Sequence, residues 1–171
     1  MHLECGSCLV RSWRDSDREA LLRFANNRRI WRNLKDRFPH PYTAEAADAW
    51  LALNRTNPER TGWAIDVDGL AVGGIGLIPG EDVYARTAHI GYWLAEPYWG
   101  RGIATDAVRA VSDHAQRRLG FLRLEAPVFA WNPASMRVLE KCGYSREAVM
   151  RKSVFKDGEI IDSVLYTRVA N

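Results

Sequence analysis

Apolar side chains recur at spacings of three and four residues in several stretches of the chain, a pattern that predicts amphipathic helices. The first helix is predicted over residues 16–25, with Asp15 as its N-cap, and a short second one follows it. Thr43 is expected to cap a third helix. The fourth helix is predicted to begin at Arg101 and to end before Gly120. Its predicted buried face consists of Ala104, Val108, Val111, Ala115 and Leu119.

Alternating or uniformly apolar runs predict seven strands. They cover Leu9–Trp13, Trp63–Val67, Leu70–Ile78, Thr87–Leu94, Phe121–Phe129, Ser145–Phe155 and Ile160–Val169. The Asp68-Gly69 dipeptide suits a type I′ turn, so it gives the clearest hairpin signal. Asn132 followed by Pro133 predicts the start of a short fifth helix, because proline is tolerated at the first helical position. Strands and helices are mixed along residues 1–171, which predicts a single domain of α/β class.

The composition is that of one globular domain. The 171 residues suffice to bury a core, and 47% are hydrophobic while 26% are charged. No apolar run approaches the ~20 residues of a membrane span, and the N-terminus lacks the pattern of a signal peptide. We therefore expect a cytoplasmic protein with no membrane partner. The net charge of +3 is small and spread out, so direct nucleic-acid binding is not expected.

Three cysteines are too few for a disulfide framework. Cys5 and Cys8 have the C-x-x-C spacing, but they lack the second pair or the histidines that a zinc site needs. We interpret them as two ordinary thiols near a loose terminus and predict no metal. Cys142 follows a short helix with no histidine close in sequence, which argues against a covalent nucleophile.

Two glycines lie between the predicted strand Thr87–Leu94 and the fourth helix. Gly100 and Gly102 leave main-chain amides uncovered at a helix N-terminus, where the helix dipole favours an anion, and Arg101 adds a positive charge. The loop therefore predicts a seat for a phosphate or pyrophosphate, with a plain capping turn as the alternative. The dinucleotide fingerprint fails because a third glycine is missing, and the P-loop fails because Lys-Ser/Thr is missing.

This loop resembles the [Q/R]-x-x-G-x-[G/A] loop of the GNAT superfamily of acetyl-CoA-dependent N-acetyltransferases. Gly102 and Ala104 match the pattern, and Trp99 stands where Gln or Arg is usual. Other matching motifs are Phe38-Pro39-His40-Pro41-Tyr42-Thr43, Asn132-x-x-Ser135, Val138-Leu139-Glu140-Lys141-x-Gly143-Tyr144, Asp157-Gly158 and Asp162. This succession resembles the RimJ/RimL-like branch, named for ribosomal-protein N-terminal acetylation, from about Leu9 to Thr167.

The resemblance implies one GNAT-like domain with a mixed, mostly antiparallel, twisted sheet. About six to seven strands would be flanked by about four to five helices, and the fourth and fifth strands would splay apart to admit acetyl-CoA. The main chain of the fourth strand's end would hold the pantetheine arm, and the loop amides would hold the pyrophosphate. The implied cofactor-binding residues are Tyr92, Trp93, Leu94, Trp99, Gly100, Arg101, Gly102, Ile103, Ala104, Thr105, Asn132 and Ser135.

Asn132 and Ser135 have a sufficient explanation in helix capping alone. The resemblance implies more: Asn132 contacts the cofactor, and Ser135 lies near the thioester sulfur, where it would donate a proton to the leaving thiolate. Tyr144, the competing donor, is expected in the core. Four residues are expected to wall the acceptor pocket, although aromatic packing explains them nearly as well. These are Trp31, Phe38, His40 and Tyr42.

The general base is the open point, because RimL-like enzymes can carry a glutamate where this chain has Val154. An α-amino group has a pKa of about 7.7–8.0 and a lysine amine one of ~10.4, so an α-amine needs less help to lose its proton. Val154 therefore favours an α-amine or another weakly basic amine. His89 and His40 are candidate bases because imidazole accepts a proton near neutral pH, with a water chain or structural roles as alternatives.

The reaction implied is direct attack of an amine on acetyl-CoA, with a main-chain amide near Tyr92 or Trp93 stabilising the oxyanion. The acceptor stays open among a ribosomal-protein N-terminus, a free amino acid, a polyamine and an antibiotic amine. A catalytically weak acyl-CoA sensor is the alternative that Val154 motivates. An RNA- or ribosome-associated binder using the arginine-rich stretches 28–32 and 116–118 ranks last. A small enzyme of this kind can also form a homodimer.

Overall fold

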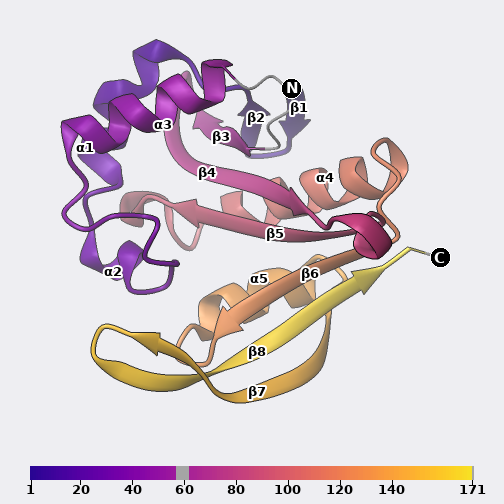
Figure 1. The fold of residues 1–171 in the computed structure, drawn as a ribbon. Coiled ribbons are helices and arrows are strands. Elements are labelled where there is room, and N and C mark those ends of the chain that lie inside the picture. The colour runs from indigo at the N-terminus through magenta and orange to yellow at the C-terminus, as the bar shows by residue number, and fades with distance from the viewer. Residues whose placement is uncertain (57–61, 171) are drawn as a thin grey trace. The chain divides into compact units, whose positions relative to one another are not determined.

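The computed structural model describes residues 1–56 and 62–170, and it confirms the mixed α/β class (Figure 1). The α-helices are α1 (Arg18–Phe24), α2 (Arg28–Trp31), α3 (Ala44–Thr56), α4 (Ile103–Arg117) and α5 (Pro133–Lys141). The strands are β1 (His2–Cys5), β2 (Cys8–Arg11), β3 (Gly62–Val67), β4 (Leu70–Pro79), β5 (Thr87–Leu94), β6 (Arg123–Phe129), β7 (Ser145–Lys156) and β8 (Glu159–Val169). They are hydrogen-bonded in the order β1-β2-β3-β4-β5-β6-β8-β7.

The chain forms two compact units, residues 1–76 with 92–107 and residues 77–91 with 108–171. Three regular elements, β4, β5 and α4, each run from one unit into the other. In the first unit, β1 to β4 pair as successive antiparallel neighbours. Asp68 and Gly69 both have positive φ, as the predicted type I′ turn between β3 and β4 requires.

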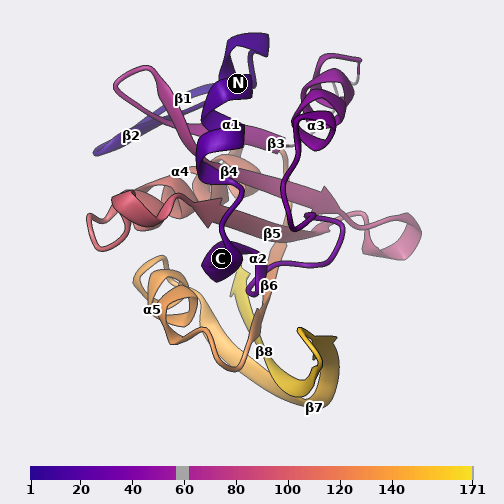
Figure 2. The same cartoon turned by 90° about the vertical axis from the view of Figure 1, so that its left-hand side faces the viewer.

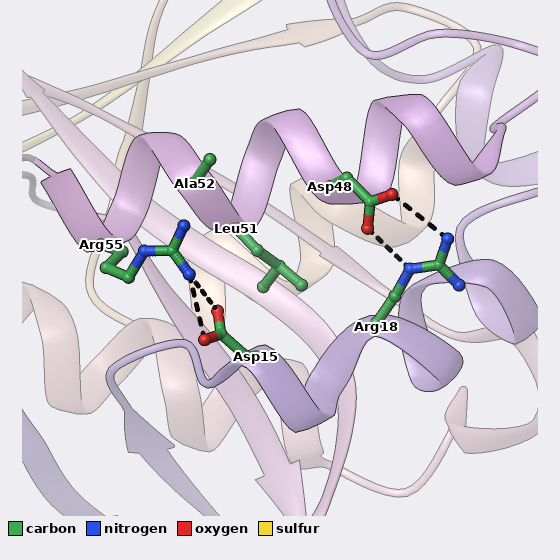
Figure 3. A pocket seen from close by; sticks show the side chains of 6 residues that line it. All are labelled: Asp15, Arg18, Asp48, Leu51, Ala52 and Arg55. Atoms are coloured by element: carbon green, nitrogen blue, oxygen red, sulfur yellow. Dashed lines mark hydrogen bonds and ion pairs between the residues drawn. The ribbon is translucent and has the colours of Figure 1, made fainter.

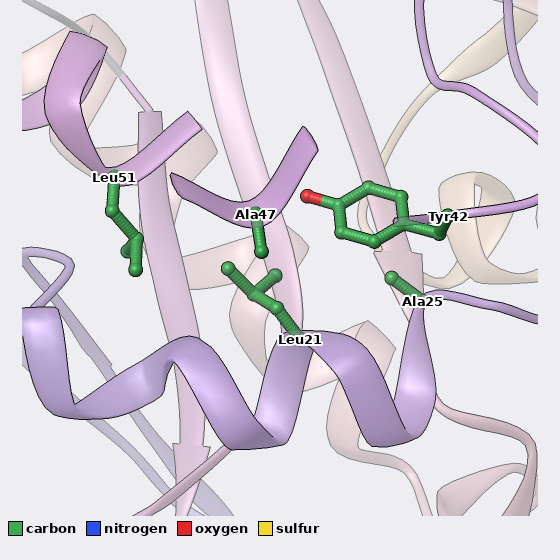
Figure 4. Close-up of a cluster of buried hydrophobic side chains, with 5 residues drawn as sticks. All are labelled: Leu21, Ala25, Tyr42, Ala47 and Leu51. Atoms are coloured by element: carbon green, nitrogen blue, oxygen red, sulfur yellow. The ribbon is translucent and has the colours of Figure 1, made fainter. Parts of the chain in front are cut away.

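Helices α1 and α3 of the first unit pack through apolar side chains that the helical spacing predicts. The buried cluster consists of Leu21, Ala25, Tyr42, Ala47 and Leu51 (Figure 4). Full burial of such a side chain contributes roughly 1.5–3 kcal/mol, so this cluster is a main source of stability in the unit. The predicted Thr43 cap is confirmed, since its hydroxyl oxygen accepts the Ala46 amide at 3.3 Å.

A buried ion network fixes the start of α1. Arg11 on β2 is only 2% exposed, and its Nε donates to Asp66 on β3 at 2.7 Å. The two terminal nitrogens of Arg11 donate to the two carboxylate oxygens of Asp17 at 2.8 Å. Asp17 also accepts the Arg14 amide at 2.8 Å, which closes a 3-10 turn over Asp15–Asp17 with Arg14 as its N-cap. The N-cap residue of α1 is Asp17, so the predicted Asp15 cap is wrong. Asp17 binds the buried Arg11 guanidinium, whereas the Asp15 carboxylate pairs with the exposed Arg55.

The second unit is built on β5, β6, β8 and β7. β6 pairs antiparallel with β8, from Arg123↔Val169 to Phe129↔Ser163. β7 and β8 form a long hairpin that curves in Figures 1 and 2. β7 is bulged between Met150 and Val154, where Lys152 has a φ of 53° and its amide donates to Asp162 at 2.8 Å.

Tyr144 belongs to the core of the second unit, as predicted. It is 4% exposed, and its hydroxyl shares a 2.8 Å hydrogen bond with Ser112 of α4. Burial raises the pKa of Tyr144 to about 12. The hydroxyl is therefore neutral at physiological pH and serves packing.

Two local predictions are wrong. Of the predicted buried face of α4, Leu119 is 41% exposed because the helix ends at Arg117, and Ala104 is only partly buried, while Ile103 and Ala107 at the start of the helix are buried. The described residues contain eight strands, one more than predicted, because β1 pairs with β2 through Cys5↔Cys8. The N-terminus is thus a strand in a sheet and not a loose end.

Candidate functional site

The parallel ladder between β5 and β6 is short. It runs from Thr87↔Arg123 to His89↔Glu125, and within the described chain no further pair joins the two strands. β5 nevertheless continues to Leu94 and β6 to Phe129. The main chain of β5 beyond His89 is therefore not paired with β6, as expected if the fourth and fifth predicted strands splay apart.

Two glycines of β4 allow β5 to come close at Trp93. A Cβ on Gly73 would lie 2.4 Å from the Trp93 carbonyl oxygen, and one on Gly74 would lie 2.7 Å from the Trp93 indole nitrogen. Any larger residue would push these groups away. This role was not predicted from the sequence, although glycine inside a strand is a recognised sign of close backbone approach.

The predicted anion loop connects the end of β5 with α4. Gly100 and Gly102 have φ values of +76° and +83°, which side chains disfavour, and a Cβ at either position would meet nothing within 4 Å. The loop thus needs glycine for its conformation and leaves open space where side chains would stand. α4 begins directly after it at Ile103, so the amides of its first turn have no acceptor within the helix.

Trp99 anchors this loop, even though it replaces the polar residue usual at its position. Its indole nitrogen donates to the Leu94 carbonyl oxygen at 2.7 Å and so ties the loop to the end of β5. The Arg29 guanidinium lies 5.2 Å from the Trp99 ring and pairs with Glu96. Arg101 lies over Tyr98 at 5.2 Å, which keeps a second guanidinium at the loop.

The four predicted acceptor residues form aromatic pairs in the first unit. Trp31 stacks on His40 with ring centroids 5.5 Å apart. Phe38 contacts Tyr42 at 5.1 Å and Trp93 at 5.7 Å. Tyr42 is 6% exposed and burial raises its pKa to about 12, so it lies in the core behind Phe38. His40 is the exposed member of the set.

Asn132 and Ser135 meet at the start of α5. The Asn132 side-chain oxygen accepts the Ser135 amide at 3.2 Å, and Pro133 occupies the first helical position. The capping interpretation is confirmed, and it fixes Ser135 in the first turn with a half-buried side chain. Their cofactor roles stay predictions.

His89 on β5 is the first of a row of contacting polar groups that continues through β6 and β7 to Thr167 on β8. Its Nε2 is 3.7 Å from Glu125, and Arg123 donates to Glu125 at 2.6 Å. Arg123 also donates at 2.6 Å to Glu147, whose other oxygen accepts the Thr167 hydroxyl at 2.8 Å. The sequence could not have indicated this row, because its members come from four strands.

A cavity of about 230 Å³ opens between the first helical turns and α3 (Figure 3). Its lining residues are Asp15, Arg18, Asp48, Leu51, Ala52 and Arg55. Arg18 pairs with Asp48 at 2.6 Å and Arg55 with Asp15 at 3.1 Å, so its charges are neutralised within the wall. None of the predicted site residues lines it.

Residues 1–56 and 62–170 contain no group of three or more His, Cys, Asp or Glu residues arranged to hold a metal ion. None of their helices combines the length and the apolar character that a membrane crossing requires.

Comparison with known proteins identifies the family. The acetyltransferase (GNAT) domain matches residues 8–145. The probable N-acetyltransferase YjcK of Bacillus subtilis (strain 168) is 48% identical over 73 residues, which are 43% of this chain and 40% of YjcK. The ribosomal-protein-serine acetyltransferase of Escherichia coli (strain K12) is 31% identical over 84 residues, 49% of this chain and 47% of that protein. The chain therefore matches less than half the length of each of these two relatives.

Among solved structures, Mycobacterium smegmatis RimJ in complex with CoA-disulfide is similar with a TM-score of 0.84 and 25% identity. The match covers 99% of this chain and 86% of that one. The extent of the domain match, together with the loop between β5 and α4, shows that the chain belongs to the GNAT family of acetyltransferases.

Proposed function

We propose that the protein is an acetyl-CoA-dependent N-acetyltransferase that transfers the acetyl group directly to a primary amine. The observation that carries this proposal is the loop of Gly100 and Gly102, whose positive φ values and open space at both Cβ positions leave the start of α4 uncovered by side chains at these two residues. A diphosphate needs such a cradle of main-chain donors at a helix N-terminus. The residues present therefore fit the pyrophosphate of coenzyme A.

The remaining cofactor contacts are proposed on the same basis. The main chain of Tyr92, Trp93 and Leu94 would hold the pantetheine arm, which the early end of the β5–β6 ladder supports. Arg101 would add positive charge at the phosphates. Asn132 and Ser135 would complete the thioester end of the site.

In the proposed reaction the amine nitrogen attacks the acetyl carbonyl carbon, and its C–N bond replaces the C–S bond to coenzyme A. A main-chain amide near Tyr92 or Trp93 would stabilise the oxyanion. The coenzyme A thiolate leaves and takes a proton from the Ser135 hydroxyl. The proton lost by the amine would pass to His89, which lies 3.7 Å from Glu125, to His40 or to a chain of water molecules, and from there it would replace the proton that Ser135 gave to the thiolate.

The acceptor proposed first is the α-amine of a protein or peptide. Val154 lies where RimL-like enzymes can have a glutamate, and an α-amine depends less on such a base than a lysine does. The name of the Escherichia coli relative, a ribosomal-protein-serine acetyltransferase, supports peptides that begin with serine. Cytoplasmic location, a homodimer and the lack of nucleic-acid binding stay predictions.

An acceptor screen tests this function. Release of the coenzyme A thiol is followed with acetyl-CoA and a panel of N-terminal peptides, amino acids, polyamines and aminoglycosides, for the wild type and for Ser135→Ala. We expect turnover with at least one α-amine, and a kcat about 10²-fold lower in Ser135→Ala with little change in the KM for acetyl-CoA. Unchanged kcat would remove Ser135 from the mechanism. Tight acetyl-CoA binding without turnover on any amine would favour the acyl-CoA sensor instead.

A further inference from the structure

The N-terminal hairpin holds two cysteines that the proposed reaction does not use. Cys5 ends β1 and Cys8 begins β2, and they are directly opposite in the antiparallel register. Gly6 and Ser7 form the turn between them, and Gly6 has the positive φ of 40° that suits the first central position of a type II′ turn. The C-x-x-C spacing is therefore a cross-strand pair.

This arrangement has the geometry of a disulfide. Directly opposed residues of antiparallel strands have Cα atoms about 4.5–5.5 Å apart, inside the range of ~4.4–6.8 Å that disulfides span. Their side chains point to the same face of the hairpin. Cys5 is 6% exposed and Cys8 is partly exposed, so a reagent reaches the pair through Cys8.

The two thiols also influence each other's ionisation. Hydrogen bonding from the Cys8 thiol lowers the pKa of Cys5, and the same hydrogen bond raises the pKa of Cys8. The pair therefore shares one stabilised thiolate. The lowered pKa favours the thiolate on Cys5, and the more exposed Cys8 becomes the attacking thiolate only after solvent base removes its proton.

The turn between the cysteines docks on the first turn of α4. The Ser7 amide and hydroxyl both donate to the same Asp106 carboxylate oxygen, at 3.2 and 2.7 Å. The Cys8 sulfur lies 3.8 Å from the Ile103 carbonyl oxygen. The pair is thus held against the helix turn that carries the candidate pyrophosphate amides.

We propose that Cys5 and Cys8 are a thiol-oxidation site that forms a reversible disulfide by exchange with low-molecular-weight disulfides. The Cys8 thiolate attacks one sulfur of the reagent RS–SR, forming Cys8–S–SR and releasing RS⁻. The Cys5 thiolate then attacks the Cys8 sulfur and releases the second RS⁻. In sum, two protein thiols are oxidised to one disulfide, the reagent is reduced to two thiols, and the two cysteine protons pass to them.

Reversibility follows from the small size of the ring. A disulfide stabilises a protein chiefly by restricting the unfolded chain, and the restriction grows with the number of residues enclosed. Here only Gly6 and Ser7 lie between the cysteines. The disulfide therefore adds little to the stability of the folded protein, and folding in turn stabilises the disulfide little. Excess thiol is expected to reduce it readily.

Intact-mass measurement after oxidation tests the proposal. The reduced full-length protein is treated with oxidised glutathione, and we expect a loss of about 2 Da with restoration by reduced glutathione. Two of the three cysteines should become unreactive toward a thiol reagent after denaturation. Cys142→Ser, the matched control, should show the same loss, because Cys142 lies in the other unit.

Cys5→Ser and Cys8→Ser should both fail to show the loss, and Cys5→Ser should carry a single glutathione on Cys8. Only glutathione adducts on the wild type, or a loss abolished by Cys142→Ser, would overturn the proposal. Circular dichroism of each variant verifies folding, and the mass readout requires no acetyltransferase activity. The result is therefore independent of the function proposed above.

Discussion

At the scale of one residue, Arg11 shows that burial decides how much an ion pair contributes to the free energy of unfolding. Its guanidinium is buried and bound by both Asp17 and Asp66, whereas the Arg55–Asp15 pair is exposed on both sides. Removing one partner of a buried pair leaves a charge without compensation. When one partner of an exposed pair is removed, water hydrates the remaining charge.

We therefore expect Asp17→Ala to lower the free energy of unfolding by about 3–5 kcal/mol. Asp15→Ala is the matched control, two residues away, and should cost about 0–1 kcal/mol. Urea unfolding followed by circular dichroism measures both. Equal effects of the two substitutions would show that the buried network contributes no more than a surface pair.

Tyr144 makes the free energy of unfolding depend on pH in the alkaline range. Its pKa is about 12 in the folded protein against 10 as the ordinary value, because burial disfavours the phenolate. The folded state keeps its proton where the unfolded state loses it, so stability is complete below pH ~10 and falls as pH rises toward ~12. Since one pKa unit corresponds to about 1.4 kcal/mol, titration over this range costs about 2–3 kcal/mol.

Tyr144→Phe should remove that part of the alkaline loss, although it also gives up the Ser112 hydrogen bond and so lowers stability at neutral pH. The free energy of unfolding is measured at several values between pH 8 and pH 12. Tyr84→Phe is the control, because Tyr84 is exposed. If the wild type and Tyr144→Phe lose stability in parallel with pH, this origin of the dependence is wrong.

The structural role of a residue could be predicted from the sequence where its partners are close in the chain. Asn132 caps α5 because its side chain meets an amide three positions ahead, which the sequence contains in full. The neighbours of His89 could not be predicted, because Glu125 comes from another strand. The predicted Asp15 cap failed for a similar reason: Arg11, which is bound by the distant Asp66 on β3, makes Asp17 the more favourable position.

At the scale of elements, turns and caps were predicted better than ends and short strands. Both Asp-Gly hairpin turns have the positive φ values that the dipeptide favours, at Asp68-Gly69 and Asp157-Gly158. β1 was missed because four residues of mixed polarity carry no periodic signal. Its existence depends on pairing with β2, which local sequence does not encode.

The loop between β5 and α4 permits a matched comparison of two glycines. Gly102 and Gly143 have φ values of +83° and +81°, and an added Cβ would meet nothing within 4 Å at either site. Alanine at either position should therefore impose similar backbone strain. Only at Gly102 would the methyl group lie among the amides proposed to bind the pyrophosphate.

We expect Gly102→Ala to weaken acetyl-CoA binding by about 10–100-fold, the effect of one lost charge-assisted hydrogen bond. Gly143→Ala should bind as the wild type does. Calorimetric titration gives the affinities, and the rise in melting temperature with acetyl-CoA gives an independent measure. Equal affinity in the two variants would place the pyrophosphate elsewhere.

For the whole molecule, the strand order was the least accessible feature. Local hydrophobic patterns predicted most of the strands. They did not predict the parallel β5–β6 pair or the position of β8 between β6 and β7. Only the resemblance to a family supplied the splay and the open sheet. The domain match over residues 8–145 confirms that resemblance, while the individual cofactor and acceptor residues stay predictions.

The two compact units are expected to unfold together. The chain passes between them at residues 76/77 in β4, 91/92 in β5 and 107/108 in α4, always inside a regular element. Unfolding one unit breaks hydrogen bonds in elements that the other needs. We therefore predict a single cooperative transition, with coincident urea curves from tryptophan fluorescence and far-ultraviolet circular dichroism. Curves with different midpoints would instead show two independent domains.

The bulge of β7 has a consequence for the protein at high concentration. β7 is the last strand of the sheet, and an outermost strand that is long and flat offers its unused main-chain groups to strands of other molecules. The interruption between Met150 and Val154, with the charged Lys152 in a left-handed conformation, breaks that flatness midway. The interruption therefore protects the chain against edge-to-edge aggregation, so that a deletion restoring a regular strand there would create a molecule prone to fibre formation.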